Sequence, residues 1–142
     1  MLPKWTPELA VRVATRLQAI LDAPQSHSPW VVETARRTGG LPVYGDLGGT
    51  ITLTPQGEVL MYDEESETVT AVTERMWQDV ALASLAKWYP DLQDLLPTRP
   101  EAALGCPNCS GSGWMMDGRL FCRLCRGLGW IEHPSAELEA AG

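Results

Sequence analysis

The chain near its C-terminus reads Cys106-Pro107-Asn108-Cys109-Ser110-Gly111-Ser112-Gly113-Trp114, and 16 residues later it reads Cys122-Arg123-Leu124-Cys125-Arg126-Gly127-Leu128-Gly129-Trp130. Both copies have the form CxxCxGxGW. Two residues between paired cysteines allow a tight turn that directs both sulfurs at one ion, and zinc takes four thiolates at tetrahedral corners. The first glycine after each pair permits the positive φ that such a turn needs. The pattern therefore predicts one structural zinc ion, bound by Cys106, Cys109, Cys122 and Cys125.

The segment between the two copies, residues 114–121, has Asp117-Gly118 at its middle. This predicts a hairpin that returns the second cysteine pair to the first, as in a zinc ribbon. The alternative is a redox dithiol, but a redox CxxC needs only one motif and usually opens a helix, which these glycine-rich exits do not favour. Four thiolates would also leave a zinc ion no open position for catalysis.

Residues upstream of the cysteines show helical and strand periods in turn. Apolar residues at helical spacing follow Thr6, a capping residue, and a second, shorter helix is expected from Ser28-Pro29 to Gly39-Gly40. Alternating segments at 50–54, 58–62 and 68–72 predict an antiparallel meander of at least three strands. A helix with one apolar face is then expected over 73–89.

The fold class expected from this order is α+β, with helices packed on a small antiparallel meander and a single-zinc ribbon after it. Pro97-Thr98-Arg99-Pro100 is typical of a linker. We therefore expect an α+β domain at 1–97, a linker at 98–104, a zinc module at 105–132 and a C-terminal tail at 133–142.

Composition narrows the functional class. The 142 residues carry a formal net charge of −7, which disfavours general binding to nucleic acid or an anionic membrane and suits a basic partner. No secretion signal opens the chain and no apolar stretch is long enough to span a bilayer, so a cytoplasmic location is expected. In a reducing compartment, CxxC pairs favour metal binding over disulfides.

An acidic cluster lies in the turn before the last strand of the meander: Asp63, Glu64, Glu65 and Glu67. It has two interpretations, a solvated turn or an electrostatic contact for a protein with a basic surface. Nothing in the sequence places a general acid opposite these carboxylates, so they are not predicted to be catalytic.

The CxxCxGxG units resemble the zinc-binding cysteine-rich region of DnaJ-type chaperones, which has four units and two zinc ions. This chain has two units, enough for one cluster, and lacks the His-Pro-Asp signature of the partner-binding domain. The resemblance implies a zinc fold with a protein-binding surface and does not carry chaperone activity over.

The N-terminal part is similar to the SUKH superfamily, many of whose members are bacterial immunity proteins that neutralise toxins. The residues that carry this similarity are Gly48-Gly49-Thr50-Ile51-Thr52-Leu53-Thr54-Pro55-Gln56-Gly57-Glu58-Val59-Leu60-Met61-Tyr62-Asp63, followed by a turn, a strand and a helix. The similarity implies that the partner is a toxin; the zinc module would instead suit a client protein.

The function expected from the sequence is protein binding without catalysis, in an immunity-like or adaptor role. No Walker-type, Rossmann or nucleophile-elbow motif is present in the sequence. Two alternatives stay open, a thiol-dependent redox protein and a nucleic-acid-associated zinc protein. Metal content would distinguish the redox protein from a protein-binding zinc protein, and salt-dependent binding of DNA or RNA would identify the nucleic-acid-associated protein.

Overall fold

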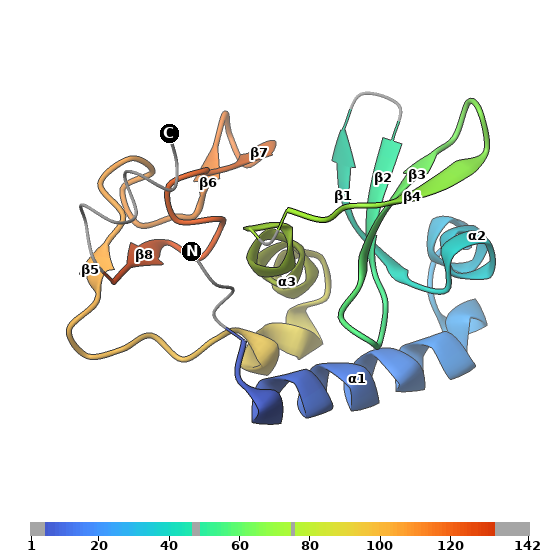
Figure 1. Cartoon of the computed structure of the whole chain (residues 1–142), viewed down its shortest axis with the longest axis horizontal. Helices are drawn as coiled ribbons and strands as arrows, with labels where there is room; N and C mark the ends of the chain where they lie inside the picture. The colour runs from blue at the N-terminus through green and yellow to red at the C-terminus, as the bar shows by residue number, and fades with distance from the viewer. Residues whose placement is uncertain (1–4, 47–48, 75, 133–142) are drawn as a thin grey trace.

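The computed structural model describes residues 5–46, 49–74 and 76–132. Three α-helices and a four-stranded sheet are followed by four short strands of the cysteine module (Figure 1). In chain order the elements are α1 (Pro7–Asp22), η1 (Pro24–Ser26), α2 (Pro29–Thr38), β1 (Leu41–Asp46), β2 (Gly49–Leu53), β3 (Val59–Asp63), β4 (Thr68–Ala71), α3 (Met76–Trp88), η2 (Pro90–Leu95), β5 (Leu104–Gly105), β6 (Trp114–Met115), β7 (Leu120–Phe121) and β8 (Trp130–Ile131).

The first two helices begin and end where their sequences indicate. The Leu9 amide donates to the Thr6 hydroxyl at 3.1 Å, which caps α1. One face of α1 is buried in the core through Leu9, Val13 and Leu17. Helix α2 ends at Gly39, whose φ of 73° lies in the left-handed region that glycine adopts without strain. Local sequence signals are therefore sufficient for both helices.

The sheet is an antiparallel meander with strand order β1-β2-β3-β4, which confirms the α+β class. The prediction of at least three strands missed β1, because Pro42 and Gly45 in that segment are typical of turns. The sheet accommodates them at an edge, with an irregularity in register between Pro42 and Tyr44. Helices α2 and α3 both contact β1.

Helix α3 is buried on every side along its middle, which corrects the expectation of one buried face. All eight residues from Asp79 to Ala86 are buried. In Figure 1, α3 lies between the sheet and the cysteine module, so each neighbour covers one side of it. A helix covered on opposite sides needs apolar or small residues all round, and its sequence here, Val80-Ala81-Leu82-Ala83-Ser84-Leu85-Ala86, meets that need.

Buried apolar residues form two clusters. One is made by the helices and the four-stranded sheet, and the other surrounds the cysteines. Trp114 and Phe121 of the cysteine module pack against the first cluster, so the two parts share an interface. The domain boundaries expected from the sequence stay a prediction, and the expected tail, residues 133–142, lies outside the described residues.

Candidate metal centre

The two CxxCxGxGW copies are related by an approximate twofold arrangement. The Cys106 amide donates to the Gly129 carbonyl, and the equivalent Cys122 amide donates to the Gly113 carbonyl, both at 2.9 Å. Strand β6 pairs with β7 in the same register in which β8 pairs with β5, so that Trp114 faces Phe121 and Trp130 faces Gly105. Each copy is therefore joined to the other by an equivalent backbone hydrogen bond.

The glycines are required because the two backbones approach closely. Gly111, Gly113, Gly127 and Gly129 all have φ between 83° and 87°. A Cβ atom at Gly129 would lie 2.5 Å from the Gly111 carbonyl oxygen, and one at Gly113 would collide with the Gly127 carbonyl oxygen. Any side chain at Gly113 or Gly129 would therefore push the two cysteine turns apart.

The four thiols converge on one point. All four cysteines are buried, and their Sγ atoms lie within 4.8 Å of one another. The Cys106 and Cys122 sulfurs are 3.7 Å apart, and so are those of Cys109 and Cys125. Sulfurs about 2.3 Å from a tetrahedral zinc ion would be separated by about 3.8 Å. The thiol arrangement therefore fits a four-sulfur metal site, which the sequence predicted.

Hydrogen-bond donors around the sulfurs favour the thiolate form. The Gly113 amide donates to the Cys109 Sγ at 3.1 Å, and the Asn108 side-chain amide donates to the Cys122 Sγ at 3.4 Å. For Cys122, burial raises the pKa, but hydrogen bonds with the Cys125 backbone, Asn108, the Leu124 backbone and Cys106 together outweigh it and lower the pKa to about 7. Burial dominates at the other two thiols with shifted values and raises the pKa of both Cys106 and Cys125.

The second copy of the motif is attached to α3 by a buried ion pair. Arg126 Nη1 donates to Asp79 Oδ2 at 2.9 Å, and both residues are buried. The backbone of Arg126 has a φ of 59°, and its equivalent in the first copy, Ser110, has 56°. Arg126 therefore replaces a small polar residue at the same left-handed position. Its guanidinium pairs with Asp79 of α3.

An aromatic cluster fills the rest of this interface. The Trp77 and Phe121 rings are 5.1 Å apart in an edge-to-face arrangement, and Tyr44 packs against Phe121 and Trp114. Lys87 Nζ lies 3.9 Å from the centre of the Trp114 ring, a cation–π contact, and donates to the Gly118 carbonyl. The hairpin β6–β7 is thus held to the C-terminal end of α3.

The acidic residues predicted to contact a partner do not lie with the cysteines. Asp63 ends β3, and Glu64, Glu65 and Glu67 occupy the turn between β3 and β4, on the opposite side of α3 from the cysteine module (Figure 1). Three of them have partners within the chain. Asp63 Oδ1 accepts from the Glu65 and Ser66 amides, Glu64 accepts from Thr50, and Glu67 pairs with Arg37.

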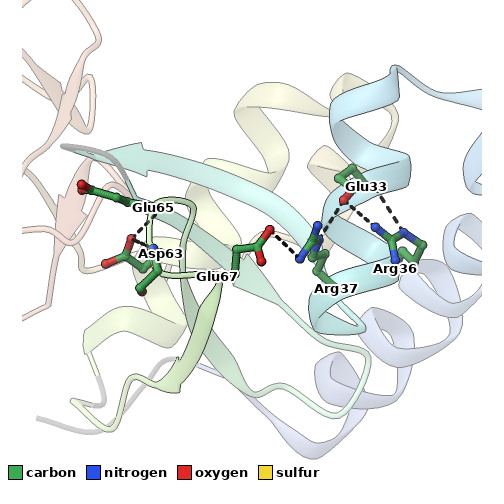
Figure 2. A network of polar contacts seen from close by, with 7 residues as sticks. Glu33, Arg36, Arg37, Asp63, Glu65 and Glu67 are labelled. Carbon is green, nitrogen blue, oxygen red and sulfur yellow. Dashed lines mark hydrogen bonds and ion pairs between the residues drawn. The ribbon is translucent and has the colours of Figure 1, made fainter.

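Figure 2 shows how Glu67 joins the acidic turn to helix α2. Glu67 Oε1 is 3.2 Å from Arg37 Nη1, and Arg37 and Arg36 both pair with Glu33. Hydrogen bonds from Arg36 and Arg37 hold the pKa of Glu33 below its ordinary value. Much of the acidic cluster therefore stabilises its own turn, and its role toward a partner stays a prediction.

Asp79 and Arg126 are the important residues that sequence reasoning missed. They are 47 positions apart, and neither belongs to a recognisable motif. The one available signal was a difference between the two copies, which have Ser110 and Arg126 at the same position. Asp79, which is the one acidic residue in the sequence of α3, was the matching residue.

Within the parts of the chain that the structure describes, no helix combines the length and apolar character needed to cross a bilayer. The resemblances to DnaJ-type zinc regions and to the SUKH superfamily stay predictions, because a comparison of the chain with protein-family models, curated proteins and solved structures found no match.

Proposed function

We propose that the four cysteines hold one zinc ion as a structural cross-link, and that the chain is a non-catalytic protein-binding protein, acting as an adaptor or as a toxin-neutralising immunity protein. The observation that carries the zinc assignment is the closed set of four buried sulfurs around one point. Sulfur donors alone favour zinc among the metals common in cells, and four of them leave no position for a substrate.

The sulfur contacts support a metal site over a redox pair. The closest sulfurs, Cys106 with Cys122 and Cys109 with Cys125, belong to different motifs. A redox-active CxxC motif exchanges electrons between the two cysteines of one motif. Sulfur contacts between the two motifs are instead what tetrahedral binding of one ion by both motifs requires.

A binding role is supported by large apolar side chains on the surface. Trp30 is 44% exposed and Trp88 is 59% exposed. Met116 and Leu120, on the hairpin that Lys87 joins to α3, are also exposed. Exposed tryptophans are enriched at protein interfaces, where one large ring contributes much of the binding energy.

Metal content tests the first part of the proposal. Protein purified under reducing conditions without added metal should contain about one equivalent of zinc by elemental analysis. Alkylation under native conditions should modify none of the four cysteines, and it should modify all four after chelation. Metal-free protein with reactive thiols, or with two disulfides, would overturn the zinc assignment.

Partner capture tests the second part. Zinc-loaded protein should be cross-linked in native cell extract, and each captured protein should be purified and titrated against it. Reproducible one-to-one binding supports the binding role. Turnover of a captured small molecule or protein would instead favour an enzyme, and binding to nucleic acid that weakens steeply with salt would favour the nucleic-acid alternative.

A further inference from the structure

Strand β4 is an edge strand with no covering element among the described residues. It pairs with β3 on one side only, and all four of its residues, Thr68 to Ala71, are exposed. Its largest apolar side chain, Val69, is 43% exposed. The outer side of β4 therefore presents backbone groups that another chain can pair with.

The register shows which backbone groups face outward. The Val72 amide donates to the Val59 carbonyl at 2.9 Å, and the pairing continues with Thr70 opposite Met61. Because alternate residues of an antiparallel pair exchange hydrogen bonds, Thr68 and Thr70 face β3. Val69 and Ala71 therefore direct their N–H and C=O groups away from the sheet.

The opposite edge of the sheet has features that block such pairing. Strand β1 contains Pro42, which has no N–H group, and its register is irregular between Pro42 and Tyr44. The Pro42 carbonyl accepts a hydrogen bond from the Tyr89 hydroxyl. Strand β4 has no proline, charged residue or bulge. Proteins usually protect open edges with those devices, and only β1 has them.

A hollow of about 430 Å³ begins where β4 ends. Ala71, Val72 and Thr73 are among its lining residues, and so are the acidic residues Glu58 and Glu74. No basic residue is among its described lining residues. A lysine or arginine side chain entering this hollow would therefore meet two carboxylates.

Negative charge also lies at the other end of β4, where the acidic turn carries the exposed Glu65. Antiparallel pairing with a second copy would bring the acidic turn of each copy beside Glu58 and Glu74 of the other, and these like charges would repel. A segment of another protein with basic residues at both ends would instead be attracted to the acidic turn at one end of β4 and to Glu58 and Glu74 at the other. This holds whether the segment runs parallel or antiparallel to β4.

We propose that β4 accepts an extended segment of a partner protein as a fifth strand, with an uncharged middle and a lysine or arginine at each end. The segment adds backbone hydrogen bonds to Val69 and Ala71, and one basic side chain enters the hollow between Glu58 and Glu74. At about 3.3 Å per residue, residues 67 to 74 span about 23 Å, so the two basic positions are about seven residues apart.

The proposal rests on the protein-binding function and names its mode of recognition. The first experiment measures fluorescence anisotropy with a labelled synthetic peptide, Arg-Arg-Val-Thr-Val-Thr-Val-Arg-Arg, and with a second peptide in which glutamate replaces every arginine. We expect the zinc-loaded protein to bind the arginine peptide and not the glutamate peptide. Peptide binding should also slow hydrogen exchange of the Val69 and Ala71 amides.

Two variants of one residue isolate the backbone contribution. Val69→Ala and Val69→Pro both remove the valine side chain, and only Val69→Pro removes the outward N–H, which β3 does not use. We expect Val69→Pro to weaken binding by roughly tenfold relative to Val69→Ala. Circular dichroism establishes that both variants fold.

A charge variant gives an independent measurement. Glu58→Gln with Glu74→Gln should weaken binding roughly fivefold at low salt and make it less sensitive to salt. The matched control, Glu101→Gln with Asp117→Asn, removes the same charge on the far side of α3 and should leave binding unchanged.

Several results would overturn the proposal. These are no binding of the arginine peptide, equal binding by Val69→Pro and Val69→Ala, and equal effects of the two charge variants. A wild-type dimer that Val69→Pro dissociates would assign the edge to a second copy. A captured partner that binds Val69→Pro and Val69→Ala equally would leave the protein-binding function standing and refute only the edge as its site.

Discussion

Replacing Arg126 with methionine should destabilise the whole chain, because it removes a buried ionic partner of a buried carboxylate. The Asp79 and Arg126 side chains are 0% and 6% exposed, and their closest N–O distance is 2.9 Å. At that distance and an effective dielectric constant of about 20, the attraction is about 6 kcal/mol, much of which offsets the loss of hydration. Removing one partner of such a pair costs about 3–5 kcal/mol.

We expect Arg126→Met to lower the free energy of unfolding by about 3–5 kcal/mol, a large part of the 5–15 kcal/mol typical of a domain. The measurement is urea unfolding of zinc-loaded protein, followed by tryptophan fluorescence and circular dichroism. The double variant Asp79→Leu with Arg126→Met should recover most of the loss, because a well-packed apolar pair replaces the ion pair without burying a charge. Arg126→Ser, which copies Ser110, should retain zinc while losing stability.

A loss below about 1 kcal/mol for Arg126→Met, the value of a solvated surface pair, would refute the role assigned to this ion pair. That role would also be refuted if the losses of stability in Arg126→Met alone and Asp79→Leu alone simply added in the double variant. Either result would mean that the module and α3 are not coupled through this pair.

Three further predictions follow from the metal centre and its interface. Gly113→Ala and Gly129→Ala, each as a single variant, should abolish zinc retention, measured after gel filtration. A Cβ at Gly111 would have no backbone atom nearer than 4.0 Å, so Gly111→Ala should retain zinc and lose only about 1 kcal/mol of folding free energy. Removal of zinc with a chelator should speed amide exchange in α3, measured by mass spectrometry, and unchanged exchange would show that the module does not cover that helix. Burial raises the pKa of Cys106 and Cys125, so zinc must displace their protons at neutral pH. Apparent zinc affinity should therefore rise between about pH 6 and about pH 8. Competition with a chromophoric chelator measures this affinity, and a flat pH profile would contradict the prediction.

The four-sulfur site could be predicted from sequence because all its determinants are local. Each CxxC spacing sets one turn, each following glycine sets the left-handed backbone, and the repeat itself indicates that the two turns meet at one ion. The cap at Thr6 and the alternation in β2 are equally local signals, and both predicted elements are present.

The rest depends on contacts between segments that lie far apart in the sequence. Pro42 and Gly45 are compatible with a strand only because β1 is an edge with an irregular register. Asp79 could be explained only once Arg126 was placed beside it, 47 positions later. The ion pair between Glu67 and Arg37 could not be predicted for the same reason, because the sequence does not indicate that the helix carrying Arg37 faces the acidic turn.

The burial of α3 on every side has a consequence for the order in which the polypeptide is made. During synthesis, residues 76–88 leave the ribosome before residues 105–131, which cover one side of the helix and supply Arg126. Until then the nascent chain exposes that apolar side, with the Asp79 carboxylate upon it. The main core can close against the sheet at this stage, but its central helix acquires its second cover only after the last cysteine has been translated. Under the proposed zinc assignment, zinc availability at that moment would set how long the newborn chain displays a surface that chaperones bind and that promotes aggregation.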